Sequence, residues 1–164
     1  MRAQCPPGRQ RFSHNRPQSM ITGLTHLHSY LAYLVLASLF LGFFFFLFGR
    51  LRGRPFGPAE RGLALLALIF THLQFLAGLL LYFIGPKGFA YWRLDDVMQN
   101  ESLRLYAVEH ISVNLIGVAL ITIGYSRAKR QASSRAKFSS LSTFYGLGLL
   151  LLLSRIPWQA WLGL

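Results

Sequence analysis

The stretch LHSYLAYLVLASLFLGFFFFLF, residues 27–48, decides the fold of this chain because it contains no Asp, Glu, Lys or Arg. An α-helix rises about 1.5 Å per residue, so roughly twenty apolar residues cross a hydrocarbon core about 30 Å thick. Backbone polar groups inside a bilayer must be satisfied within the segment, and this run is apolar on all faces rather than alternating. The stretch therefore predicts a transmembrane helix rather than a barrel strand.

Three further apolar runs of similar length follow, at residues 62–84, 105–124 and 138–162. Gly and Pro residues, which interrupt regular structure, follow the first and second runs. The sequence therefore predicts an all-α protein, an integral membrane four-helix bundle, formed by one domain at residues 21–164. The predicted helices cover about 24–48, 61–84, 103–125 and 138–162.

The charge distribution agrees with this prediction. Charged residues make up 13% of the 164 residues, yet the net charge is +12. A soluble domain usually has about a quarter charged residues. The basic residues lie between the apolar runs, as is typical of cytoplasmic loops beside anionic lipids. The expected partner is the lipid bilayer, and nucleic-acid binding is not expected.

Loop charge also predicts the orientation. The first loop has four arginines between residues 50 and 61, and the third has five basic residues between 127 and 137. The second loop is balanced by three acidic residues. We therefore expect loops 1 and 3 in the cytoplasm and both termini outward.

The basic segment 1–20 conflicts with this orientation because it would place four arginines outside. It has no apolar core, so it is not a secretory signal peptide. We expect a disordered tail. A transit peptide, or translation that starts at Met20, is an alternative, and in either case the tail is absent from the mature protein.

Polar residues within the apolar runs are the candidate functional groups, since such residues are costly in a bilayer. Four of the five histidines lie in or beside these runs. Tyr106, His110, Asn114 and Gly117 recur at helical spacing and are expected to face inward. Similar stripes run through His26, Tyr30, Tyr33 and Ala37 on the first helix and through Tyr145, Gly148, Leu151 and Arg155 on the fourth.

The predicted depths suggest a haem site. His28 and His110 should lie in the outer half of the membrane and His72 near its midplane. Two histidines at similar depth on opposing helices can hold a haem iron between them, and four-helix bundles commonly frame such sites. Arg155 would then pair with Glu109 or with haem propionates. No thiol ligand competes, because the single cysteine, Cys5, lies in the tail.

Other interpretations use the same residues. His26 and His28 can be merely interfacial, and His72 can bond a helix carbonyl. Histidines from three helices can also bind zinc or copper. The structural polar candidates are Glu109, Asn114 and Gln74, and the Glu109–Arg155 pair can serve only to fix helix register.

Five segments carry a resemblance to a known family. They are THLHSYLAYLVL (25–36), FTHLQFLAGLLLYF (70–83), LRLYAVEH (103–110), ITIGYSRAKR (121–130) and LSRIPW (153–158). They resemble small four-helix bacterial membrane proteins classed as cytochrome B-like. A weaker similarity extends to SirB-like proteins and HemJ-type protoporphyrinogen oxidases.

The resemblance implies a protein of the bacterial inner membrane that binds haem b. It implies that the haem ligands come from His26 or His28, His72 and His110. We expect an electron carrier or redox subunit, within a larger membrane redox complex or a homo-oligomer. The alternatives are a non-catalytic accessory or scaffold subunit and a haem-dependent membrane oxidoreductase.

Overall fold

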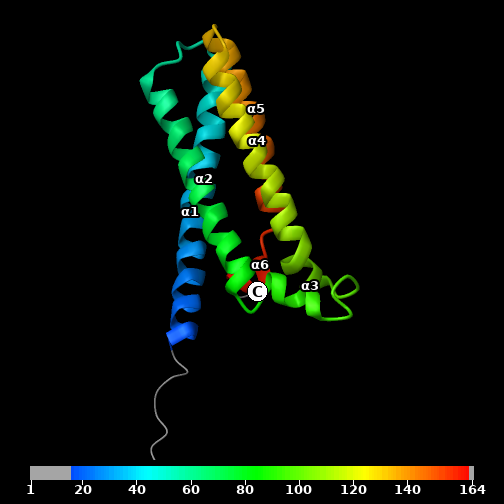
Figure 1. Ribbon diagram of the computed structural model, residues 1–164. Helices are drawn as coiled ribbons and strands as arrows, with labels where there is room; N and C mark the ends of the chain where they lie inside the picture. Colours follow the sequence, from blue (N-terminus) through cyan, green and yellow to red (C-terminus); the bar gives the residue numbers. More distant parts are fainter. Residues whose placement is uncertain (1–15, 163–164) are drawn as a thin grey trace, which may run out of the picture.

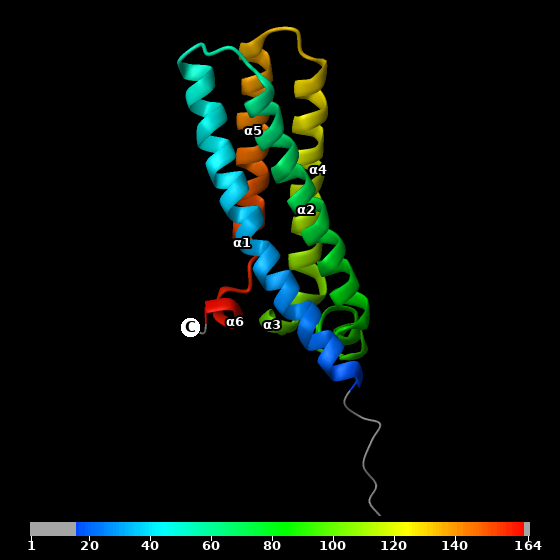
Figure 2. The same ribbon diagram turned by 90° about the vertical axis from the view of Figure 1, so that its left-hand side faces the viewer.

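The computed structural model describes residues 16–162, and every regular element in this range is helical. The four long helices are α1 (Arg16–Leu51), α2 (Pro58–Ile84), α4 (His110–Arg130) and α5 (Ser134–Ser154). The α1–α2 and α4–α5 loops lie at one end of the bundle, and the start of α1 lies at the other end with the short elements (Figures 1 and 2). The short elements are η1 (Gly88–Arg93), α3 (Glu101–Arg104), η2 (Leu105–Glu109) and α6 (Trp158–Leu162).

Four helical segments of the described chain are long and apolar enough to cross a membrane. In each of them only 22–39% of the most apolar window is buried inside the protein. Large apolar side chains such as Phe40, Leu76, Leu115 and Leu150 point outward instead. A water-soluble bundle buries its apolar stripe and exposes polar residues, so this distribution fits lipid contact.

The helices form a ring in which α1 contacts α2 and α5, and α4 contacts α2 and α5. The buried core lies toward the end with the two hairpin loops. There the Phe46 and Tyr145 rings meet edge to face, with centroids 5.8 Å apart. The Tyr145 hydroxyl donates a hydrogen bond of 2.8 Å to the Ala64 carbonyl and so ties α5 to α2. This core satisfies its buried hydroxyl, as membrane interiors require.

Glycines allow α4 and α5 to approach closely. A Cβ atom at Gly148 would lie 2.6 Å from the Ile121 side chain and 3.2 Å from the Gly117 carbonyl oxygen. A Cβ atom at Gly124 would overlap the Cβ atom of Phe144. Small residues at such contacts let two backbones pack tightly where water provides no driving force.

The fourth predicted helix, 138–162, is wrong at its C-terminal end. Helix α5 begins earlier, at Ser134 with Ser133 as its N-cap, and ends at Ser154. A separate short helix, α6, follows from Trp158. The physical reason is Pro157, which lacks an N–H donor and disfavours helical backbone at the preceding residue.

The first and third helices are longer than predicted. Helix α1 begins at Arg16, so residues 16–20 are helical rather than disordered. Pro17 is tolerated there because the first turn of a helix has no intrahelical partner for its N–H groups. Residues 1–15 of the predicted tail lie outside the described range. The third segment runs continuously from Glu101 to Arg130 through the π-helical turn η2.

The contact between α4 and α5 can be tested with Gly124→Ala. The added methyl group must displace the Phe144 backbone or side chain, so we expect a loss of about 1–3 kcal/mol in unfolding free energy. Gly62→Ala is the matched control, because no atom lies within 4 Å of a Cβ at that position. Thermal melting of the detergent-solubilised protein by circular dichroism measures both. Equal melting temperatures for the two variants would contradict the close contact.

Candidate functional site

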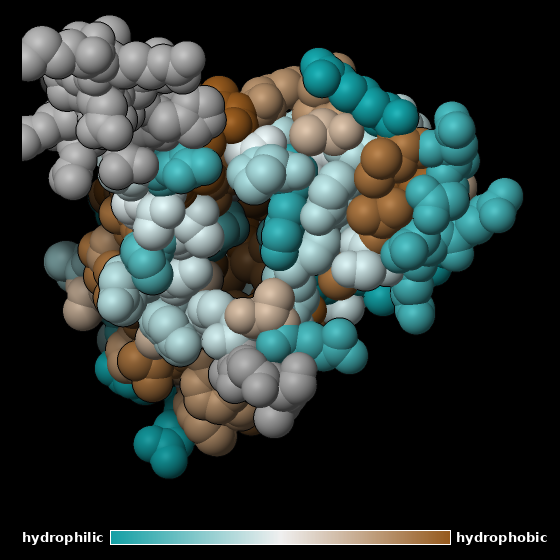
Figure 3. Space-filling model, turned by 90° about the horizontal axis from the view of Figure 1, so that it is seen from below, coloured by the Kyte–Doolittle hydropathy of each residue, from teal (hydrophilic) through white to brown (hydrophobic). Residues whose placement is uncertain are grey.

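A cavity of about 390 Å³ lies between α1, α2, α4 and α6, toward the end opposite the hairpin loops. Sites for small molecules and cofactors typically have ~300–1,000 Å³. Figure 3 views this end and shows a hollow with an apolar interior between more polar side chains. The cavity exists because α5 ends at Ser154 while α1, α2 and the segment leading into α4 continue past it.

Two of the predicted histidines face one another in this cavity. His28 lines it from α1 and His110 from α4. Their ring centroids are 6.4 Å apart and their planes lie at 73°. The structure thus brings together one of the histidine pairs that the sequence leaves open.

His110 has a fixed orientation. Its Nδ1–H donates a hydrogen bond of 2.6 Å to the Arg155 carbonyl oxygen, just beyond the end of α5. A carbonyl can only accept, so the proton of the neutral ring is on Nδ1 and the lone pair is on Nε2. The Asn114 amide nitrogen lies 3.1 Å from Nε2 and donates to it. Asn114 is one helical turn from His110, so the predicted polar face of this helix does line the cavity.

His28 is held by α2. Its Nε2 lies 3.4 Å from the amide nitrogen of Gln74. Its ring occupies the space beside Gly78, where a Cβ atom would come within 2.7 Å of His28 Cε1. Nδ1 of His28 is buried and has no hydrogen-bond partner. One nitrogen of this imidazole is thus free beside the cavity.

The buried polar atoms without partners gather here. In the described part of the chain they are His28 Nδ1, Gln74 Oε1 and Asn114 Oδ1, and all three residues line the cavity. Buried polar groups nearly always have a partner, and leaving one unpaired costs about 1–3 kcal/mol. The cavity is therefore built to receive something that interacts with these groups.

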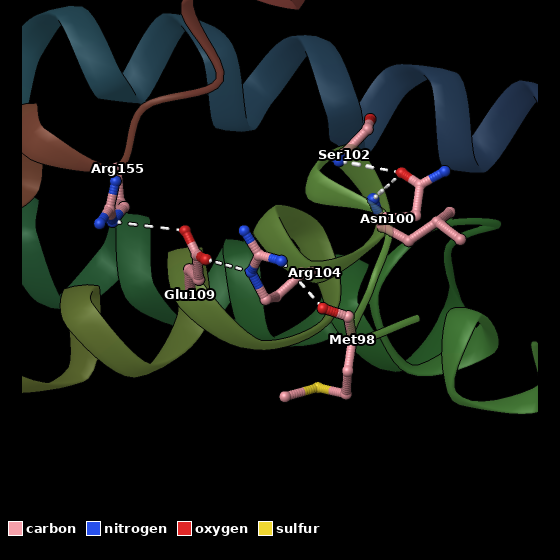
Figure 4. Close-up of polar contacts among 7 residues, drawn as sticks. Met98, Asn100, Ser102, Arg104, Glu109 and Arg155 are labelled. Atoms are coloured by element: carbon pink, nitrogen blue, oxygen red, sulfur yellow. Dashed lines mark hydrogen bonds and ion pairs between the residues drawn. The ribbon is translucent and has the colours of Figure 1, made fainter. Parts of the chain in front are cut away.

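An ionic cluster supports His110 from the adjacent turn (Figure 4). The Glu109 carboxylate accepts a hydrogen bond of 2.7 Å from Arg104 Nε and pairs with Arg155 Nε at 3.4 Å. The predicted pair of Glu109 and Arg155 is confirmed. Arg155, however, lies in the break after α5 with its side chain 48% exposed, rather than within a helix. The cluster joins the start of α4 to the residue whose carbonyl orients His110.

The π-helical turn η2 immediately precedes His110. The His110 N–H donates to the Leu105 carbonyl, five residues back. The extra residue in this turn rotates the rest of the helix relative to α3, and such turns often occur at functional sites. Tyr82 on α2 donates to the Ala107 carbonyl within the turn at 3.0 Å. A hydrogen bond from α2 therefore stabilises the irregular backbone of η2, the turn that positions His110.

The other two predicted histidines lie elsewhere. His72 donates from Nδ1 to the Leu68 carbonyl at 2.8 Å, and its Nε2 lies 3.4 Å from the Thr122 hydroxyl. His26 is exposed and stacks on Tyr30, at a centroid distance of 6.5 Å. The stripe that contains His26 and Tyr30 faces outward, since Tyr30 is 68% exposed. Neither histidine lines the cavity.

Two residues that line the cavity have no counterpart among the sequence predictions of the site. Lys87 lines the cavity, with Nζ 4.4 Å from the centroid of the Tyr106 ring. Gly78 provides the space for His28. A sequence signal existed for Gly78, because Gln74, Gly78 and Tyr82 are spaced by four residues and share one face of α2.

A site for a lone metal ion has less support. No group of three or more His, Cys, Asp or Glu side chains within residues 16–162 is arranged to hold an ion. Zinc sites use three or four such ligands, whereas a haem iron needs only one or two from the protein. No protein-family model, curated protein or solved structure matches this chain.

The ionic cluster can be tested with Glu109→Gln. The neutral amide cannot hold two guanidinium groups, so we expect a loss of about 1–2 kcal/mol in unfolding free energy. Glu101→Gln is the control, because Glu101 is exposed and takes part in none of the ion pairs among the described residues. Denaturation in mixed micelles measures both changes. A Glu109→Gln protein as stable as the control would show that the cluster is not structural.

Proposed function

We propose that this chain is an integral membrane protein that binds a b-type haem and serves as an electron-transfer or redox subunit. The observation that supports this most directly is the pair His28 and His110, which face one another across a largely apolar cavity. The resemblance of the sequence to cytochrome B-like membrane proteins points in the same direction.

The spacing of the two rings suits axial ligation. Imidazoles that bind one ion from opposite sides have ring centres roughly 6 Å apart, because each metal–nitrogen bond is about 2 Å long. The centroids of His28 and His110 are 6.4 Å apart. The residues present therefore fit an iron between these two histidines.

The surrounding groups suit ligand histidines. A ligating histidine usually donates its other N–H to a carbonyl or carboxylate, which fixes the ring and raises its basicity. His110 already donates Nδ1–H to the Arg155 carbonyl, and its Nε2 lone pair would bind the iron in place of the Asn114 amide that it now accepts from. Gln74 carries both a donor and an acceptor beside His28, so one amide serves either tautomer of that ring. His28 can then ligate through its partnerless Nδ1.

The role of the protein is to hold and insulate the redox group. A bound haem would supply one-electron chemistry at its iron, and its potential depends on the axial ligands and the surrounding dielectric. The Gln74 amide would orient His28, and the Arg155 carbonyl would orient His110. The apolar wall contributed by α1, α2 and α4 would lower the dielectric constant around the bound group. His72 bonds its own helix and Thr122 and is assigned to packing.

We further propose that the four apolar helices lie in the bacterial inner membrane, with the α1–α2 and α4–α5 loops in the cytoplasm. These loops share one end of the bundle (Figure 1), and most of the basic residues that flank the apolar segments lie in the loops or in the helix turns beside them. Basic loops favour the cytoplasmic side. The haem site then lies in the outer half of the membrane.

The haem proposal is tested by the visible spectrum of the purified protein, as isolated and after addition of haem. We expect reduced-minus-oxidised α and Soret bands that are lost or shifted in His28→Ala and His110→Ala. The bands should persist in His26→Ala, whose ring is exposed, and in His72→Ala, which lies outside the cavity. A folded, colourless protein that takes up no haem would sink the proposal and leave an accessory or scaffold role. Loss only in His72→Ala would refute the ligand assignment.

The orientation is tested in a Cys5→Ser background with two matched variants, Gln99→Cys and Gln131→Cys. Gln99 lies in the connection after η1, and Gln131 lies between α4 and α5. A membrane-impermeant maleimide should label Gln99→Cys in intact cells and Gln131→Cys only after permeabilisation. The reverse pattern would invert the proposed topology.

A further inference from the structure

We propose that Lys87 binds the carboxylate of an amphiphilic ligand whose apolar body fills the cavity. This inference rests on the proposed function, in which the carboxylates are the propionates of the haem. Lys87 is the one cationic side chain that lines the cavity in the part of the chain that the structure describes.

The charged groups at the cavity favour an anionic ligand. No acidic side chain lines the cavity within the described residues. The described residues form three ion pairs. Arg54 pairs with Glu60, and Arg104 and Arg155 both pair with Glu109. Lys87 takes part in none of them, and its exposed side chain places the ammonium at the mouth of the apolar space. A carboxylate at this point would gain a charge-assisted hydrogen bond.

The ammonium group has a defined position. Its Nζ lies 4.4 Å from the centroid of the Tyr106 ring, a cation–π contact that holds it on the cavity side. The backbone beside it is constrained as well. Gly88 has a φ of +76°, and a Cβ atom there would lie 2.7 Å from the Tyr82 ring. Only glycine fits this turn without strain, so the turn sets where Lys87 enters the mouth.

Arg155 is less suited to this role. Its guanidinium pairs with Glu109, and Arg155 does not line the cavity. Its contribution to the site is the backbone carbonyl that orients His110. The geometry therefore assigns the two cations different tasks. Arg155 fixes a ligand histidine, and Lys87 receives the acidic end of the bound group.

The ligand that matches this arrangement has one acidic edge and an apolar body. The histidine pair lies deeper in the cavity, and Lys87 belongs to the loop that follows α2. If a haem is the ligand, His28 and His110 would hold its iron, and Lys87 would bind a propionate. A phospholipid headgroup offers the same anionic chemistry, and it is the alternative source that the experiment must separate.

The test compares Lys87→Gln with the wild-type protein in binding haem and haem dimethyl ester, in lipid-free non-ionic detergent. The ester keeps the porphyrin and the iron and lacks both carboxylates. We expect Lys87→Gln to weaken haem binding on the order of tenfold, the loss of one charge-assisted contact. Binding of the ester should not change, and Lys87→Arg should restore haem binding.

The matched control is Lys129→Gln. Lys129 also lies over a tyrosine ring, at 5.9 Å from Tyr125, but near the opposite end of the bundle. It should leave both affinities unchanged. Equal haem affinity in wild type and Lys87→Gln would overturn the inference, as would equal weakening of haem and ester. If anionic phospholipid lowers haem affinity in wild type but not in Lys87→Gln, the headgroup competes for the same cation, which supports an anion site at Lys87.

The two proposals fail differently. A wild-type protein with no histidine-dependent Soret band overturns the haem function and this inference together. A wild-type protein with that band, and an unchanged Lys87→Gln variant, overturns the assignment of Lys87 alone.

Discussion

The break of the fourth spanning helix at Pro157 is the constraint on which the site depends. A helix leaves its last four carbonyl groups without intrahelical partners. At the end of α5, two of these groups and the carbonyl of the C-cap residue Arg155 have side-chain donors. The Leu151 carbonyl accepts from Ser154, the Leu153 carbonyl accepts from the Trp158 indole, and the Arg155 carbonyl accepts from His110. If the helix continued, the Arg155 carbonyl would belong to its own backbone ladder, and His110 would lose its orienting acceptor.

The same break makes the two ends of the bundle differ. At the hairpin end all four long helices contribute, and side chains such as Phe46, Phe138 and Tyr145 are fully buried. At the other end, α1 with its 36 residues and α2 with its 27 outlast α5, which has 21. The short helix α6 lies below the end of α5 (Figure 2), and its residues Ala160 and Trp161 line the cavity. The cavity is thus a consequence of unequal helix lengths, while close glycine contacts keep the remainder tightly packed.

The sequence predicts the number of long helices and the shared end of the two basic loops, because these follow from apolar length and loop charge alone. It also predicts the pairing of Glu109 with Arg155, since opposite charges in an apolar setting seek each other. It cannot tell which histidines meet. His26 and His28 are two residues apart and lie about 200° apart around one helix, so packing alone decides which faces inward. The π-helical turn adds a rotation before His110 that hydrophobic periodicity does not encode.

His72 is a histidine that the sequence suggests as a ligand and that the structure places outside the cavity. It lies in the middle of an apolar helix, as a deep ligand would, yet its ring bonds its own helix at Leu68 and Thr122 on α4. A polar group buried among apolar residues needs partners, and the backbone is the nearest source. His28 differs because the Leu24 carbonyl, its equivalent acceptor, takes up neither of its nitrogens, and Nδ1 has no partner at all. Both histidines stand out in the sequence because their neighbours are apolar. Only the hydrogen-bond partners in the structure distinguish a histidine that serves packing from one that is free to bind a metal.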